Sequence, residues 1–150
     1  MSTTKFDIKE ADLSQAEEIA SLFRRSRIEM LPFLPVLHSK EEDLAFLKEQ
    51  VLSRQHVYVA MVDDRIAGFV AFFEEHLDHL YMLPEFAGLG IGAALLKRAK
   101  ESEKRLELWV FQENKRAIQF YRKHGFEIVR STDGSSNEEN SPDHLMLWVQ

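Results

Sequence analysis

The chain has 150 residues, of which 45% are apolar and 29% are charged, and its formal net charge is −6. This length and balance predict one globular domain over residues 1–150, and the acidic charge disfavours nucleic acid and anionic membranes as partners. The absence of cysteine excludes disulfides and a thiol nucleophile, and no apolar run reaches the ~20 residues of a membrane span. The N-terminus lacks the apolar centre of a signal peptide, so we expect a cytoplasmic protein.

The first half of the chain predicts a strand, two helices and a hairpin. The expected elements are a strand at 6–9, a helix that fades near 30, a second helix from 40 to about 52, and strands at 57–62 and 66–73. The first helix has two possible caps, Asp12 with Gln15 or Ser14 with Glu17. The second helix opens on an S-x-x-E capping box at Ser39 and Glu42.

The connection between these helices, residues 31–37, reads LPFLPVL and is apolar although two prolines interrupt it. Two interpretations remain open for this segment. It can be a loop packed over a binding cleft, or it can be a buried connector without a functional role.

A predicted strand at 77–83 leads into the stretch around which the rest of the chain is organised. Pro84 ends the strand, and Gly88, Gly90 and Gly92 then alternate before a run of strong helix formers. Glycines allow positive φ and close approach of a ligand, and the first amides of a helix have no intrahelical partner. The turn therefore predicts an anion site suited to a diphosphate. The alternative is a tight connection with no ligand.

Two phosphate-binding motifs compete for this turn. A P-loop requires Lys and then Ser or Thr after its last glycine, and Gly92 is followed by two alanines, which excludes it. The dinucleotide fingerprint fits Gly88, Gly90 and Ala93, with Glu113 about 20 residues further on. That fold requires successive βαβ units, whereas this chain has an antiparallel meander before the turn and one clear βαβ unit.

The second half predicts a strand at 106–111, parallel to the strand at 77–83, and then a helix capped by Asn114. Gly125 stands where a left-handed C-terminal cap is expected. Strands at 126–130 and 145–149 close the chain around a polar loop. The predicted order is β-α-α-β-β-β-α-β-α-β-β.

Two motifs in this order resemble those of the GNAT superfamily of acyl-CoA-dependent N-acyltransferases. Motif A, Q/R-x-x-G-x-G/A, falls on Ala87, Gly90 and Gly92, with alanine in place of Gln or Arg. The signature N-x-x-A-x-x-F-Y-x-x-x-G-F falls on residues 114–126. The resemblance covers nearly the whole chain and implies the GNAT α/β fold, with a mixed, mostly antiparallel sheet and helices on both faces. It also implies transfer of an acetyl group from acetyl-CoA to a primary amine by direct attack, without a metal.

The resemblance further implies which residues hold the coenzyme. These are Leu80, Tyr81, Met82, Leu83, Ala87, Gly88, Leu89, Gly90, Ile91, Gly92, Ala93, Asn114, Ala117 and Tyr121. In the family the strands at 76–83 and 106–111 splay apart to admit the pantetheine arm, and the tyrosine at position 121 protonates the leaving thiolate. A phenol with a pKa near ~10 suits that step.

The sequence indicates the general base less clearly than the general acid. Strand alternation predicts that His76 and Asp78 share a face with Leu80, and that His79 and Tyr81 share the other face. By resemblance His76 and Asp78 are the candidate bases, His79 is a further candidate, and a structural role for a strand histidine is the alternative.

The loop at 133–143 is acidic through Asp133, Glu138, Glu139 and Asp143. An acidic rim would attract a cationic acceptor, whereas the alternative is a solvated loop. We expect a small-molecule or peptide amine as acceptor and a possible homodimer. A protein that holds acyl-CoA without turnover is the second hypothesis, and a small dinucleotide binder is the third.

Overall fold

The computed structural model describes residues 5–150. The elements follow in the order β1 (Asp7–Glu10), η1 (Leu13–Gln15), α1 (Ala16–Met30), α2 (Lys40–Phe46), η2 (Leu47–Leu52), β2 (His56–Val62), β3 (Arg65–Phe73), β4 (His76–Met82), η3 (Pro84–Phe86), α3 (Ile91–Ser102), β5 (Arg105–Phe111), α4 (Lys115–Lys123), β6 (Glu127–Thr132) and β7 (Asp143–Val149). This order confirms the predicted one, with boundaries that differ by a few residues. None of the helices in the described part of the chain is long and apolar enough to cross a bilayer.

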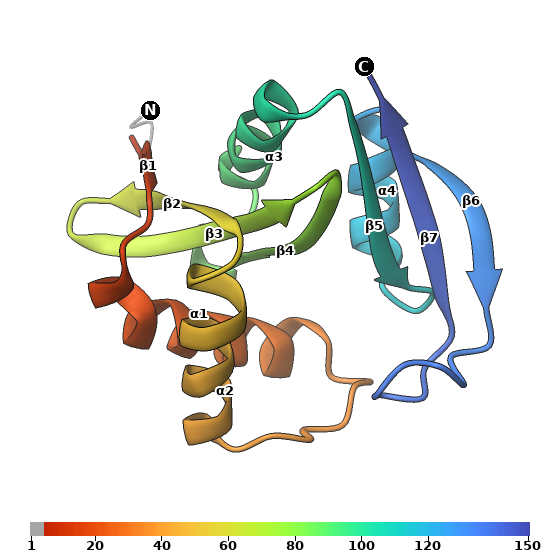
Figure 1. The fold of residues 1–150 in the computed structure, drawn as a ribbon, viewed down its shortest axis with the longest axis horizontal. Helices are drawn as coiled ribbons and strands as arrows, with labels where there is room; N and C mark the ends of the chain where they lie inside the picture. The colour runs from red at the N-terminus through yellow and green to blue at the C-terminus, as the bar shows by residue number, and fades with distance from the viewer. Residues whose placement is uncertain (1–4) are drawn as a thin grey trace.

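The seven strands form one sheet in the order β1-β2-β3-β4-β5-β7-β6. Strands β4 and β5 are parallel, and the other neighbours pair antiparallel. Figure 1 shows α1 and α2 on one side of β2, β3 and β4, and α3 on the opposite side. The α/β fold with a mostly antiparallel sheet and helices on both faces is therefore confirmed, and the dinucleotide alternative, which needs a doubly wound parallel sheet, is wrong.

Each face of the sheet has its own apolar core. Under α3 and α4 the core includes Phe72, Leu95 and Phe126, and under α1 and α2 it includes Ile19 and Phe69. These side chains are at most 1% exposed. Burying a side chain of this kind contributes about 1.5–3 kcal/mol relative to leaving it in water, so the two cores fix the positions of the helices on the sheet.

The structure confirms the predicted helix caps and decides between the two alternatives for the first helix. Asp12, rather than Ser14, caps the first turn of η1, because its carboxylate accepts from the Ser14 amide at 2.8 Å while the Gln15 side chain accepts from the Asp12 amide at 3.0 Å. Ser39 and Glu42 form the expected reciprocal capping box of α2. Helix α2 continues into the π-helical segment η2, so together they span the predicted second helix.

Strands β4 and β5 meet only at one end. Their ladder contains the single register pair His76 and Glu107, next to a hydrogen bond of 2.7 Å from the Glu107 amide to the Glu75 carbonyl. Beyond this point the two strands separate, while β5 remains paired with β7 from Arg105 to Phe111. We call this opening the fork. It is the splay that the resemblance implies, and sequence periodicity alone does not predict it.

A β-bulge in β4 changes which side chains share a face. Ala71 pairs with His79 and Phe72 pairs with Leu77, so Asp78 is an extra residue without a register partner on β3. The prediction that His76 and Asp78 share a face with Leu80 is therefore wrong. Leu77 packs in the core that Leu80 joins, because the bulge shifts the alternation by one residue.

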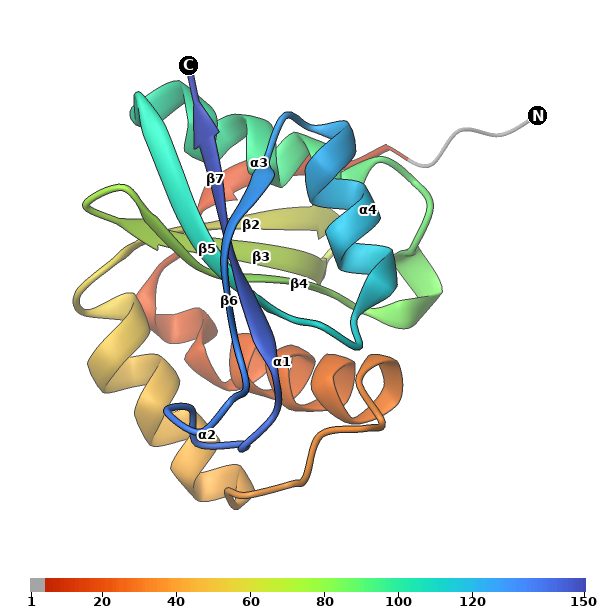
Figure 2. The ribbon, with the colours of Figure 1, turned by 90° about the vertical axis from the view of Figure 1, so that its right-hand side faces the viewer.

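Two loops from distant parts of the sequence lie side by side. Figures 1 and 2 both show the segment after α1, residues 31–39, next to the β6–β7 connection, residues 133–142. Leu31 and Leu34 are buried, whereas Val36 and Leu37 are exposed. The 31–37 segment thus contains both a buried connector and an exposed apolar surface.

Candidate acetyl-transfer site

The glycine turn has the geometry of an anion site. Gly88 and Gly90 have φ of +80° and +83°, a left-handed conformation that glycine adopts without strain. A Cβ at either position would meet no atom within 4 Å, so the surface over the turn is open. The first bond into α3 runs from the Ala94 amide to the Gly90 carbonyl at 3.1 Å. The three preceding amides, from Ile91 to Ala93, therefore have no intrahelical partner and fit a diphosphate.

A carboxylate next to this turn forms ion pairs with two arginines. Glu85, in η3, pairs with Arg25 at 2.8 Å and with Arg65 at 3.2 Å. The hydrogen bond from Arg25 is the largest cause that lowers the pKa of Glu85 to about 2. The two guanidinium groups keep Glu85 ionised and offset its repulsion of a phosphate group bound nearby.

Helix α4 lies beside the start of α3. A Cβ on Gly92 would lie 3.5 Å from the Phe120 ring and 3.1 Å from the Met82 methyl group, so the absence of a side chain there allows β4, α3 and α4 to approach closely. Asn114 caps α4 by accepting from the Ala117 amide at 3.2 Å. The capping role expected for Asn114 is therefore confirmed. Ala117 is half-buried and packs against the core under α3 and α4.

Tyr121 is buried in the core under α3 and α4, with its ring edge-on to Phe120 and Phe126. Burial is the main cause that raises the pKa of the Tyr121 hydroxyl, and the Tyr81 side chain adds to the shift. The hydroxyl therefore stays protonated at neutral pH, and its burial makes it a weaker acid than an exposed phenol.

The two candidate bases lie at the closed end of the fork. His76 is exposed and forms the register pair with Glu107. Asp78 is exposed at the bulge and accepts a hydrogen bond of 2.9 Å from the Gln55 amide group. His76 and Met82 lie six positions apart along the strand, a distance of roughly 20 Å. The structure does not bring His76 into contact with Tyr121.

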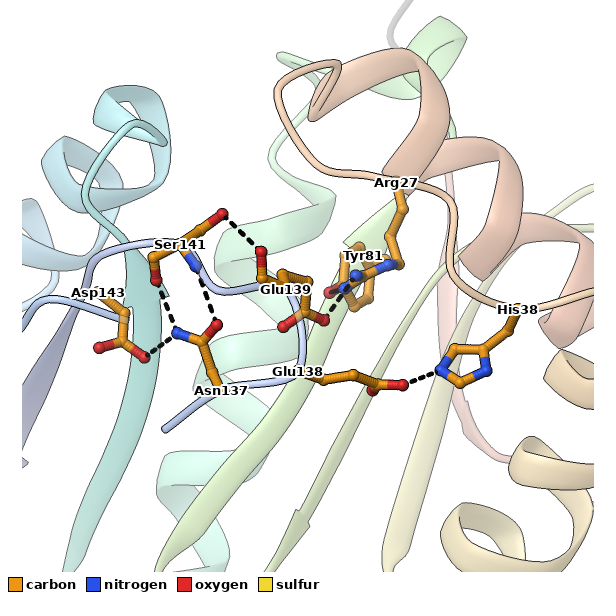
Figure 3. Close-up of polar contacts among 8 residues, drawn as sticks. All are labelled: Arg27, His38, Tyr81, Asn137, Glu138, Glu139, Ser141 and Asp143. Atoms are coloured by element: carbon orange, nitrogen blue, oxygen red, sulfur yellow. Dashed lines mark hydrogen bonds and ion pairs between the residues drawn. The ribbon is translucent and has the colours of Figure 1, made fainter. Parts of the chain in front are cut away.

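A polar cluster lies on the face of β4 opposite Tyr121. The Arg27 guanidinium donates to the Tyr81 hydroxyl at 3.1 Å and to the Glu139 carboxylate at 3.2 Å. Figure 3 shows these three side chains converging from α1, β4 and the 133–142 loop. Arg27 and Glu139 are 23% and 15% exposed, so their ion pair is screened less than one on the surface. Tyr81 thus presents its side chain to this cluster, while the resemblance assigns it to the coenzyme.

His79 lies next to this cluster among aromatic rings. Phe23 and Phe46 stand edge-on to its imidazole at 5.6 Å between ring centroids. Its Nδ1 is buried without a hydrogen-bond partner among the described residues. Burial, with a smaller contribution from the charge of Arg27, lowers the pKa of His79 to about 4. The imidazole is therefore neutral at physiological pH.

The acidic residues of the 133–143 stretch have three different environments. Glu139 pairs with Arg27, and Glu138 pairs with His38 across the two loops, as Figure 3 shows. Asp133 is exposed and caps its own turn by accepting from the Ser135 amide at 2.9 Å. Asp143 is buried in β7 and accepts from Thr132 and Asn137. The prediction that Asp143 contributes to an acidic rim is wrong, because its carboxylate is used inside the fold.

Sequence reasoning missed Arg27 and the side-chain role of Tyr81. A signal for Arg27 exists in the sequence, because it follows the buried Phe23 by one helical turn and places a charge beside the apolar face of α1. No local pattern connects Arg27 with Tyr81 or Glu139, which are 54 and 112 residues further along the chain.

Comparison with known proteins agrees with this geometry. The model of the acetyltransferase (GNAT) domain family matches residues 53–128, which contain the glycine turn, the fork and α4. The chain belongs to the GNAT family of acetyltransferases. As a GNAT protein it is an N-acetyltransferase, and its co-substrate is acetyl-CoA. The described residues include no group of three or more His, Cys, Asp or Glu side chains that could hold a metal ion.

Relatives of this GNAT chain extend over most of its length. It is 30% identical to the peptidyl-lysine N-acetyltransferase YjaB of Salmonella typhimurium, over 82% of this chain and 84% of that protein. It is 28% identical to the peptidyl-lysine N-acetyltransferase YiaC of Escherichia coli, over 94% and 95%. The PaiA N-acetyltransferase of Thermoplasma acidophilum, solved in complex with coenzyme A, shares the fold with a TM-score of 0.73 at 20% identity, covering 97% of this chain and 99% of that one.

Proposed function

We propose that this single GNAT domain acetylates the side-chain amine of a lysine in a peptide or protein, by direct attack on acetyl-CoA bound in the same complex. The main structural support for this proposal is the fork between β4 and β5. The open glycine turn and Tyr121 are on one side of it, and the contacts of Arg27 with Tyr81 and Glu139 are on the other. The relatives named peptidyl-lysine N-acetyltransferases support lysine as the acceptor.

In this proposal the coenzyme uses backbone groups along the turn and the free edge of β4. The diphosphate binds the amides of Gly88 to Ala93, and the arm bonds the strand from Leu80 to Leu83. Asn114 and Ala117 line the passage of the arm beside α4. Ala87 contributes no charge, so the proposed site depends on amides instead of the Gln or Arg side chain of the family motif.

The proposed reaction needs one acid and one proton acceptor. The amine nitrogen attacks the thioester carbonyl carbon, a carbon–nitrogen bond forms, and the carbon–sulfur bond breaks. The Tyr121 hydroxyl gives its proton to the departing thiolate. The nitrogen loses a proton through water to a base, for which His76 and Asp78 remain the proposed residues. Their exposure at the closed end of the fork favours a relay through solvent over direct contact.

Holding acyl-CoA without turnover is the second candidate, and Ala87 in motif A is the observation that favours it. The two candidates differ in chemistry, because only the enzyme releases free coenzyme A thiol when an amine is present. Substitution of Tyr121 would affect the enzyme strongly and a binding protein little.

We also propose a cytoplasmic homodimer. Trp109, Val129 and Val149 are 50%, 53% and 64% exposed on β5, β6 and β7, and they offer apolar surface for a second copy. Light scattering after size exclusion tests the dimer, and a monomer at micromolar concentration would remove it.

The first experiment is thermal unfolding with saturating acetyl-CoA and, in parallel, with NADH. A ligand at ~100 times its dissociation constant stabilises the native state by about 2.7 kcal/mol, which is several degrees for a domain of this size. We expect a shift with acetyl-CoA only, followed by thiol release with lysine peptides and a mass increase of one acetyl group. Binding without thiol release for any amine would favour the sensing protein.

A further inference from the structure

A cavity of 510 Å³ lies on the α1 and α2 side of the sheet, away from the glycine turn. Helices α1 and α2, the 31–39 loop, His79 of β4 and the 133–142 loop form its walls. Most of its lining surface is apolar, although polar and charged residues also line it, and the larger apolar side chains are Phe23, Ile28, Leu34, Val36, Leu37 and Phe46. A mostly apolar hollow of this size is typical of a ligand site.

Exposed apolar side chains gather at this cavity. Ile28, Val36, Leu37 and Phe46 are between 38% and 60% exposed, and all four line it. Large apolar groups that remain in water around a hollow cost free energy in the free protein, and this arrangement is typical of a binding surface.

The charged residues of the lining are already paired with one another. Arg24 bonds Asp43 at 3.0 Å, and Arg27 bonds Glu139 at 3.2 Å. Similarly, His38 bonds both Glu42 and Glu138. Glu42 and Glu138 share one histidine, so the excess charge of the lining is negative and disfavours a phosphate, while the remaining surface offered to an occupant is mainly apolar.

The cavity adjoins the acceptor side of the fork. His79 lines it, and Tyr81 follows two residues later with its side chain on the same face of β4, about 7 Å further along the strand. Arg27 and Glu139 line the cavity and also connect to Tyr81. An extended peptide advances about 3.3 Å per residue, so a side chain in the cavity belongs to a residue close to the one at the fork.

From these contacts we infer that the cavity binds a large apolar side chain of the substrate peptide, within about three residues of the lysine that is acetylated. This inference rests on the proposed lysine acetyltransferase function and adds its sequence preference. The lysine amine is at the fork while the neighbouring leucine or phenylalanine fills the space between Phe23, Phe46 and the 31–39 loop. Burial of one such side chain favours the correct peptide on the order of tenfold in kcat/KM.

The test compares peptides that contain one lysine and differ at one flanking position, with alanine, leucine, phenylalanine or glutamate placed up to three residues before or after the lysine. Thiol release gives kcat/KM for each. For the wild type we expect leucine or phenylalanine at one position to exceed alanine about tenfold, and glutamate to fall below alanine.

Two variants locate the origin of this preference. Ala45→Phe places a ring in the cavity, so the ratio of the leucine peptide to the alanine peptide falls to near one. Lys48→Phe adds the same ring at an exposed position outside the lining and retains the wild-type ratio. If Ala45→Phe does not fold, as judged by circular dichroism, the smaller Ala45→Leu replaces it.

Each outcome decides between the proposals. Equal kcat/KM for all lysine peptides overturns the apolar cavity site and leaves lysine acetylation intact. A preference that persists in the Ala45 variant also overturns the cavity as its source. Acetylation of small amines but of no lysine peptide overturns the proposed acceptor class. It also overturns the cavity inference, which depends on that class.

Discussion

The Tyr81 hydroxyl accepts a hydrogen bond of 3.1 Å from the Arg27 guanidinium, although 54 residues separate the two. The same guanidinium bonds Glu139, so one side chain of α1 connects the central strand with the 133–142 loop. In the proposed function the acceptor amine arrives on this side of the fork. We therefore expect the charges of Arg27 and Glu139 to affect how a cationic substrate binds.

Glu139→Gln should raise KM for a cationic amine on the order of tenfold with a smaller change in kcat. The substitution removes the negative charge of this ion pair, so the positive charge of Arg27 is no longer compensated and repels an ammonium group. Glu138→Gln is the matched control, because Glu138 is 57% exposed and pairs with His38 at the outer edge of the cavity. Steady-state kinetics checks both, and equal KM values for the two variants would contradict a specific role of Glu139.

Tyr121→Phe should lower turnover by roughly 10² or more while leaving the acetyl-CoA dissociation constant nearly unchanged. The phenylalanine ring preserves the packing against Phe120 and Phe126 and removes only the proton donor. Calorimetric titration with acetyl-CoA and thiol release with an amine separate binding from chemistry. Full turnover in this variant would show that the thiolate is protonated by another group.

Ala87→Arg should tighten acetyl-CoA binding several-fold. Position 87 is where motif A carries Gln or Arg, and its backbone is extended at the end of η3, immediately before the positive-φ Gly88. A guanidinium there adds a charge-assisted contact to a phosphate group. Because such contacts weaken with ionic strength, the gain should shrink in high salt. An unchanged affinity at low salt would mean that the turn amides already make the hydrogen bonds that the diphosphate oxygens can accept.

His79→Phe should make the protein more resistant to acid. The pKa of the His79 imidazole is lowered from about 6.5 to about 4 in the folded state, so the unfolded chain binds a proton first as the pH falls. The wild type therefore loses stability between pH 6.5 and pH 4, by an amount on the order of 3 kcal/mol for this group. The variant lacks this loss, and at neutral pH it also removes a buried Nδ1 without a partner.

Denaturant unfolding of both proteins across this pH range measures the effect. The difference in unfolding free energy between variant and wild type should grow as the pH falls. Parallel pH profiles would contradict a neutral, desolvated His79.

Local chemistry made much of the fold predictable. The capping boxes at Asp12 and Ser39, the left-handed Gly125 and the strand end at Pro84 each depend on residues within one turn of one another. The glycine turn belongs to the same class, because positive φ at Gly90 and free helix amides follow from adjacent residues. The glycine turn forms the proposed coenzyme half of the candidate site.

The acceptor half was not predictable in this way. The bulge at Asp78 depends on how β4 pairs with β3, and the fork depends on where β5 leaves β4 for β7. Alternation along one strand cannot detect either feature, and for that reason the expected faces of His76 and Asp78 were wrong.

The sequence by itself determined the order of elements, the helix caps, the glycine turn and the GNAT family, since these arise from near neighbours and from motifs with fixed spacing. Only the tertiary structure decided that Arg27 contacts Tyr81 and Glu139, that Asp143 is used inside the fold, and that the 31–39 and 133–142 loops enclose a cavity. The physical reason is that long-range side-chain contacts depend on the packing of whole helices on the sheet, and no short stretch of sequence encodes that packing.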